Sequence, residues 1–172
     1  MTILEGKGVC GGFAFGVVAF YHRKDRMVKR RRVEDSTAEL ERTKAAISAA
    51  KQQLIALYKK ALCEVGETNA QIFEIHQMML EDEDDLDSIH SIIHSQQVNA
   101  EYADAKTSHN LSQMLSSTDD DYMKERAADV RDVSERMIRI LCGSEATFHI
   151  AVYPVILAAD DLAPSETVQL DK

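Results

Sequence analysis

The sequence predicts a mainly α-helical protein in which an antiparallel helical bundle is inserted into an incomplete α/β domain. Between Val17 and Cys142 there is no proline and a single glycine, Gly66, so long helices joined by tight turns fit this zone. Apolar residues recur there at steps of three and four, as on one face of a helix. Apolar runs typical of strands flank the zone, at Phe13 to Phe20 and at Val155 to Ala159.

The first helix is predicted to begin at Ser36. Ser36 and Glu39 match a capping box, in which each side chain accepts a hydrogen bond from the other residue's backbone N–H. Gly66 is a typical helix terminator. Between them, residues at alternating steps of three and four form a seam for packing against another helix. They are Leu40, Thr43, Ile47, Ala50, Leu54, Leu57 and Ala61.

Later helices follow at short intervals, which favours antiparallel neighbours in a bundle. Asn99 is a suitable N-cap for one of them. Pro164 beside Ser165 suits the start of a short final helix. The other predicted ranges are Glu67–Leu80, Leu86–His94, Asn99–Leu115 and Asp120–Leu141.

The composition narrows the classes of partner. Lys and Arg number 20 and Asp and Glu number 29, which gives a net charge of −9, so nucleic acid is not expected as a partner. The longest apolar run, Phe13 to Tyr21, falls well short of the roughly 20 residues that span a membrane, so no membrane insertion is expected. Three widely spaced cysteines are typical of reduced thiols, and the protein is expected to be cytoplasmic.

Two motifs have both a chemical and a structural interpretation. The glycines of residues 6–11 match a dinucleotide-binding pattern, but a strand-like segment follows them instead of the required helix, which indicates a turn. Asp87, His90 and His94 could share one helical face and hold a divalent metal. With no evident fourth ligand, the interpretation as ordinary surface residues is favoured. No Ser-His-Asp pattern, CxxC motif or P-loop is present.

The predicted second helix carries two apolar stripes. The first forms a natural core face, on which His76 is interpreted as a hydrogen-bonded core histidine; it comprises Ile72, Phe73, His76, Met79 and Leu80. The second is acidic at both ends and apolar between them, and comprises Glu67, Gln71, Ile75, Met78 and Asp82. The second stripe could pack against a third helix or remain free for a partner.

An acidic run follows this helix. Residues 81–85 and Asp87 supply six negative charges without a cation. Such a run is usually a solvated turn. Beside an exposed Met78 it would instead form an acidic rim around an apolar centre, which suits a small basic protein. From the residues alone, the sequence indicates a helical partner-binding domain attached to part of an α/β domain.

Three segments together resemble Enzyme I of the bacterial phosphoenolpyruvate-dependent sugar phosphotransferase system. They are Ile72–Glu83, Asp120–Asp132 and Leu157–Thr167, and the second is the most specific. The resemblance implies a helical domain that docks the phosphocarrier HPr, inserted at residues 33–143 into a phosphohistidine α/β domain. That domain would begin with residues 1–32 and return at residues 144–172. By matching position, the docking face would use Glu67, Met78, Met79, Asp82, Asp84, Leu115 and Arg126.

The resemblance also implies which parts of the transferase lie elsewhere. The acceptor histidine belongs to a Gly-Gly-x-Thr-Ser-His motif that is expected beyond Lys172, and the domain that binds phosphoenolpyruvate and Mg²⁺ is expected to follow it. No catalytic or metal residue is therefore assigned, and residues 1–172 alone are expected to be inactive in phosphotransfer. Two alternatives remain open: a helical protein–protein adaptor, and a regulatory phosphotransfer paralogue.

Overall fold

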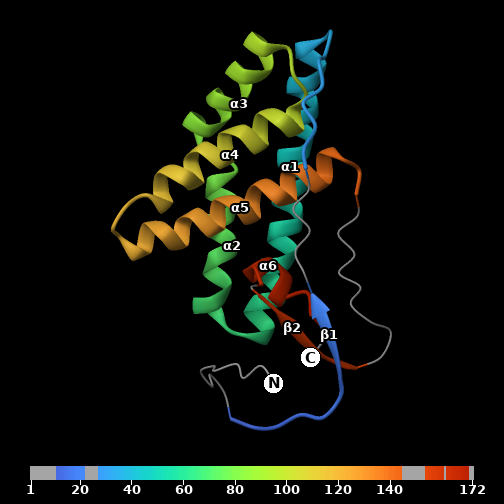
Figure 1. Ribbon diagram of the computed structural model, residues 1–172, viewed down its shortest axis with the longest axis vertical. Coiled ribbons are helices and arrows are strands. Elements are labelled where there is room, and N and C mark those ends of the chain that lie inside the picture. Colours follow the sequence, from blue (N-terminus) through green and yellow to red (C-terminus); the bar gives the residue numbers. More distant parts are fainter. Residues whose placement is uncertain (1–10, 22–26, 145–153, 161, 171–172) are drawn as a thin grey trace, which may run out of the picture. The chain divides into compact units, whose positions relative to one another are not determined.

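The computed structural model describes residues 11–21, 27–144, 154–160 and 162–170. The chain divides into two compact units, one of residues 1–24 with 149–161 and one of residues 25–148 with 162–172. The predicted mainly helical class with strands at both ends is confirmed (Figure 1). Residues 6–10 of the glycine pattern lie outside the described residues.

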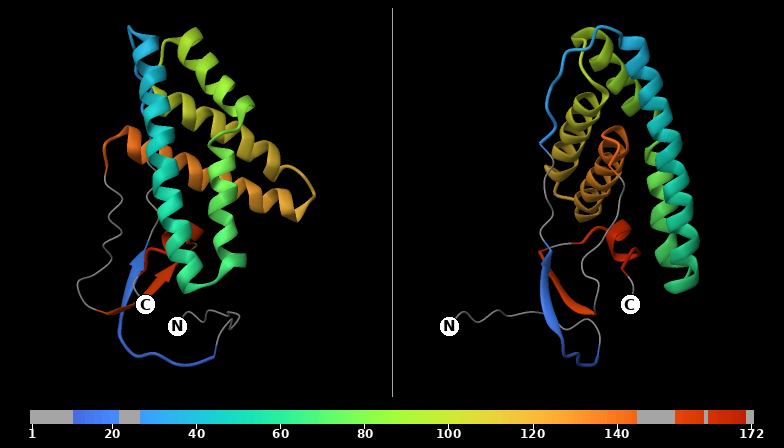
Figure 2. Two further views of the ribbon diagram at one scale, coloured as in Figure 1. Left: turned by 180° about the vertical axis from the view of Figure 1, so that it is seen from behind. Right: turned by 90° about the vertical axis from the view of Figure 1, so that its right-hand side faces the viewer.

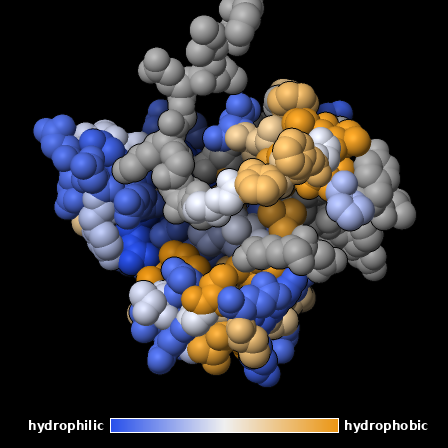
Figure 3. All heavy atoms as spheres, turned by 90° about the horizontal axis from the view of Figure 1, so that it is seen from below, coloured by the Kyte–Doolittle hydropathy of each residue, from blue (hydrophilic) through white to orange (hydrophobic). Residues whose placement is uncertain are grey.

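The strands form a two-stranded parallel sheet. Strand β1 (Val17–Tyr21) pairs with β2 (Val155–Ala159) in a register that runs from Val17 opposite Val155 to Tyr21 opposite Ala159. Parallel strands need a long connection, and here the sequence of the whole helical bundle lies between them. Apolar side chains gather on one part of the face seen in Figure 3. The exposed phenylalanines in and just before β1 are Phe13, Phe15 and Phe20.

The larger part of the helical unit is built from two hairpins and one connecting helix. Helix α1 (Ser36–Glu64) turns at Gly66 into α2 (Glu67–Met79), and α4 (Ala100–Ser116) turns into α5 (Asp121–Leu141). Helix α3 (Glu83–Gln96) connects the hairpins and packs against α1 and α4. The α4–α5 hairpin crosses the α1–α2 hairpin, and the two form separate layers (Figures 1 and 2). Gly66 has a φ of +86°, which an L-residue would adopt only with strain.

The main core lies between α1, α2 and α5. Alanines at Ala46, Ala50 and Ala61 let the helices approach closely, and the larger side chains fill the remaining space. These larger buried side chains are Leu54, Leu57, Phe73, Leu80, Val133, Met137 and Val168. The predicted seam of α1 is largely confirmed, since Thr43, Ala50, Leu54, Leu57 and Ala61 are buried.

The predicted N-cap residue of α1 is wrong. Asp35, not Ser36, accepts hydrogen bonds from the backbone N–H groups of Thr37 (2.9 Å) and Ala38 (3.1 Å). Glu39 does not complete a capping box, because its buried carboxylate accepts from the backbone N–H of Ala100 at 2.7 Å, at the start of α4. The unpaired N–H groups and positive dipole of that helix end attract the carboxylate.

The short helix α6 (Pro164–Thr167) belongs to the helical unit. Ser165, which is fully buried, donates to Asp132 Oδ1 of α5 at 2.8 Å, and Val168 enters the main core. Glu166 accepts from the backbone N–H of Ala163 at 2.9 Å, which is one half of a capping box. The domain boundaries at residues 32 and 143 remain a proposal, and residues 162–170 group with the helices.

Replacing Ser165 by Ala should lower the free energy of unfolding by about 1–3 kcal/mol, because a buried carboxylate loses its hydroxyl donor. Urea unfolding of the chain measures this. Thr167→Val is the matched control: Thr167 is exposed and donates within its own segment to Ala163 O (3.1 Å), so its effect should stay within about 0.5 kcal/mol. Equal effects of the two substitutions would contradict the assigned anchoring contact.

A buried carboxylate lies between α4 and α5. Ser134 donates to Asp104 Oδ2 at 2.6 Å, and both residues are buried. Burial raises the pKa of the Asp104 carboxyl from 3.8 to about 7, because the charged form loses its hydration. The Ser134 hydrogen bond opposes this rise in pKa, and the negative charge of Asp85 adds to it.

This pKa predicts how stability changes with pH. The folded state holds the Asp104 proton more tightly than the unfolded chain, so the contribution to stability is present at acid pH and is lost as the pH rises through about 7. The change in the free energy of unfolding caused by Asp104→Asn should therefore be more favourable at pH 8 than at pH 5, by about 1–3 kcal/mol. Urea unfolding of both proteins at the two pH values tests this, and a pH-independent difference would exclude it.

Candidate functional site

Helix α2 presents a second apolar face outside the core. Phe73 and His76 are buried, whereas Ile75 is half-buried and Met78 is 71% exposed. An exposed methionine is a flexible, polarisable contact surface of the kind found at protein-binding sites. Helix α2 therefore carries more apolar surface than its packing against α1 and α5 uses.

The acidic run continues directly from this face into the start of α3. Asp82 is the N-cap of α3, and its Oδ1 accepts from the backbone N–H groups of Asp84 and Asp85, both at 3.1 Å. Asp82 and Asp84 are exposed. Glu81 forms an ion pair with Lys51 of α1. The cap thus fixes a group of solvent-facing carboxylates beside Met78.

Arg126 of α5 is held in place by three contacts. Its Nη1 lies 3.3 Å from Asp129 Oδ2, its Nη2 donates to the Tyr122 hydroxyl at 2.6 Å, and its guanidinium lies 4.8 Å from the centre of the Tyr122 ring. Asp129 Oδ1 in turn lies 3.4 Å from Nε2 of His76 on α2. Asp129 therefore connects Arg126 to the helix that carries Met78.

His76 is a core residue, as predicted, but the predicted hydrogen bond is wrong for its Nε2, which has no hydrogen-bond partner among the described residues. It is 1% exposed, and its Nδ1 lies 3.9 Å from Asp132 Oδ2. The ring also meets that of Phe73 edge-on, with 6.1 Å between centroids. These contacts fix how α2 sits against α5, and the enclosed imidazole has no path to an external reactant.

The remaining predicted docking residues differ in position. Glu67 is exposed at the start of α2, three helical turns from Met78, or roughly 16 Å along the axis. Met79 is half-buried and packs against the main core, so it faces inward from the same helix. Leu115 is half-buried near the end of α4. Asp82, Met78 and Asp84 are thus the predicted residues that the structure places together at one exposed position.

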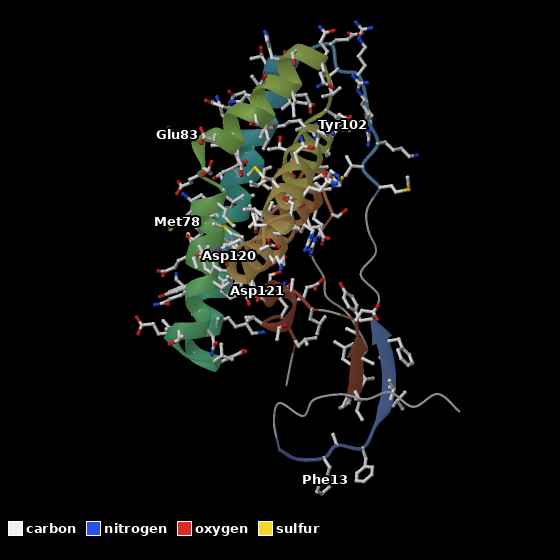
Figure 4. All side chains as sticks on the ribbon, turned by 60° about the vertical axis from the view of Figure 1, so that its left-hand side comes forward. Phe13, Met78, Glu83, Tyr102, Asp120 and Asp121 are labelled. Carbon is white, nitrogen blue, oxygen red and sulfur yellow. The ribbon has the colours of Figure 1, made fainter. Side chains whose placement is uncertain are left out.

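Sequence reasoning missed an exposed group at the α4–α5 turn. Met114, Tyr122 and Met123 are exposed there at 60%, 55% and 37%. Asp120 caps α5 by accepting from the backbone N–H of Tyr122 at 2.9 Å, beside exposed Asp121. In the view of Figure 4, Glu83 lies above Met78, and Asp120 and Asp121 lie below it. The sequence feature that could have indicated this group is the i, i+4 spacing of Tyr122 and Arg126, which places both side chains on one helical face.

Two features are absent from the described part of the chain. No three His, Cys, Asp or Glu side chains there are arranged to hold a metal ion. Asp87, His90 and His94 accordingly form no ligand set. Among the helices of these residues, none is both long and apolar enough to cross a bilayer.

Comparisons with known proteins show the family and the fold of this chain. Residues 5–126 match the family described as "PEP-utilising enzyme, N-terminal". The chain belongs to this family. It is 37% identical over 173 residues to the phosphoenolpyruvate-protein phosphotransferase of Bacillus subtilis strain 168, covering 100% of this chain and 30% of that protein. The Haemophilus influenzae protein of the same name is 36% identical over 163 residues, which cover 93% of this chain and 28% of that protein.

The chain thus spans about 30% of the length of these relatives, and it matches their N-terminal part. A solution structure of an Enzyme I protein superposes with a TM-score of 0.75 at 28% identity, over 90% of this chain and 64% of the other. The N-terminal domain of a nitrogen-type Enzyme I superposes with a TM-score of 0.70 at 21% identity, over 91% and 64%, which shows a shared fold. The resemblance drawn from the three sequence segments is confirmed.

Proposed function

We propose that this chain is the carrier-docking part of a phosphoenolpyruvate-protein phosphotransferase, Enzyme I, and that it binds the phosphocarrier HPr in the cytoplasm for sugar uptake. The carrying observation is the 71% exposure of Met78 beside the acidic start of α3. Membership of the N-terminal family supports the proposal. The proposed face comprises Glu67, Met78, Asp82, Asp84, Leu115 and Arg126, and Met79, which packs against the main core, supports it from beneath.

Each part of this face has a distinct physical role. Met78 supplies apolar area that is removed from water on binding, which is the main source of affinity at an interface centre. The exposed carboxylates of Asp82 and Asp84 attract a basic partner and raise its association rate. Arg126, already held by Asp129 and Tyr122, loses little side-chain entropy when a partner contacts it.

Removing the apolar centre should weaken carrier binding. Met78→Ala is expected to raise the Kd for HPr about five- to thirty-fold, because a central contact is worth about 1–2 kcal/mol. Titration of isotope-labelled HPr, followed by NMR, measures the Kd. Met27→Ala is the matched control, since Met27 is 93% exposed outside the proposed face. Equal Kd values for the two variants would exclude Met78 as the centre.

Reversing one rim charge tests the electrostatic part of the same prediction. Asp84→Lys should weaken binding mainly through a slower association rate, and the loss should shrink as salt screens exposed charges. Glu41→Lys is the control, because Glu41 is an exposed carboxylate on α1 paired with Lys44 at 2.7 Å. Stopped-flow mixing of HPr with each variant at two ionic strengths measures the association rates that distinguish the two substitutions. A salt-independent effect, or the same effect from Glu41→Lys, would contradict the steering role.

The regulatory alternative concerns the pathway that the carrier serves. Both the Enzyme I protein and the nitrogen-type domain share this fold, with TM-scores of 0.75 and 0.70. The identity of the carrier that binds more tightly distinguishes the sugar pathway from the regulatory one. Titrating the sugar-pathway HPr against its nitrogen-pathway counterpart should give the tighter Kd for the former, and the reverse order would favour the regulatory paralogue.

A further inference from the structure

A small cavity lies within the helical unit, away from Met78. It holds about 50 Å³ and is bounded by α1, the end of α2, α3, α4 and α5. A single water-sized group needs about 10–15 Å³ of such space, so the cavity has room for three or four non-hydrogen atoms. Its lining is mixed: the apolar walls include Ile47, Leu86, Val133 and Met137, and the polar groups are Asp85, Asp104, Thr107, Ser108 and Ser134.

The polar groups of the cavity lack a matching cation. Asp104 is buried, and Ser134 donates to its Oδ2, while no described residue donates to its Oδ1. Asp85, half-buried on α3, lines the same space. The pKa values of both carboxyls are raised, first by burial and then by neighbouring carboxylates, and no lysine or arginine contributes to either. Two carboxyl groups therefore share a partly apolar space, and no described lysine or arginine adds a positive charge beside them.

Thr107 gives an independent indication of a missing partner. Its side chain lines the cavity, the residue is 8% exposed, and its Oγ1 has no hydrogen-bond partner among the described residues. A buried hydroxyl without a partner is costly. An incoming donor inside the cavity would satisfy it together with the free oxygen of Asp104.

We propose that this cavity binds a small primary alkylammonium ion. The three N–H donors of the ammonium group would serve Asp104, Thr107 and Asp85, and a short alkyl chain would lie against Val133 and Met137. A primary ammonium suits the site better than a divalent metal, because only two carboxylates line the cavity and no three His, Cys, Asp or Glu side chains of the described residues are arranged to hold a metal ion. The volume limits the chain to about two carbons, because ethylammonium has three non-hydrogen atoms.

The test is titration of the 172-residue chain with ethylammonium chloride at pH 8, followed by ¹H–¹⁵N NMR. Saturable shifts are expected at the amides of Asp104, Thr107 and Ser134, with a Kd of about 1 mM or weaker for so small a ligand. Ethanol, which has the same shape without the charge, and hexylammonium, which is too long, should each bind at least ten-fold more weakly. Potassium chloride at equal ionic strength should leave these amides unchanged.

Variants separate the site from a nonspecific charge effect. Asp104→Asn should weaken ethylammonium binding at least ten-fold. Thr107→Val should weaken it about three-fold or more while raising the melting temperature of the free protein, because the unpartnered hydroxyl is removed. Asp87→Asn, an exposed change on α3 outside this cavity, should leave the Kd unchanged. The proposal is overturned if ethanol or potassium reproduces the shifts, if no saturation occurs, or if Asp104→Asn binds as well as the parent.

Discussion

The contact of α2 with α5 through a buried histidine relates three elements of the helical unit to one another. His76 places its imidazole beside Asp129 and Asp132. Asp129 also holds Arg126, and Asp132 also receives Ser165 of α6. One buried side chain thus relates the outer face of α2, the start of α5 and the last described helix. These contacts also position the exposed Met78, because the opposite side of α2 is packed against the core.

Helix starts in this protein serve two purposes at once. Asp82 and Asp120 satisfy the backbone N–H groups at the exposed beginnings of α3 and α5, and their carboxylates remain at the surface. Negative charge at these positions is favourable for the fold, since it complements the helix dipole. The helix dipole therefore offsets part of the repulsion within the acidic surface beside Met78 and Tyr122.

Features with a local physical cause were predictable from the sequence, and those with a distant cause were not. The spacing of Glu67, Met78 and Asp82 predicted an outer stripe, and Met78 is exposed. The cap at Ser36 was wrong because Glu39 is recruited by the backbone of Ala100, 61 residues away. The cavity at Asp104 and Thr107 could not be predicted either, since four separated helices and the end of α2 build its walls. Periodicity describes one helix at a time, whereas these contacts depend on how the hairpins cross.

The alanines along α1 have a consequence for how such a surface could change over time. Ala46, Ala50 and Ala61 are at most 3% exposed, and they set how closely the neighbouring helices approach α1. Enlarging any of them would push its neighbours outward and re-aim the exposed methionine by a fraction of an ångström. Recognition could therefore drift or be tuned through side chains that no partner ever touches.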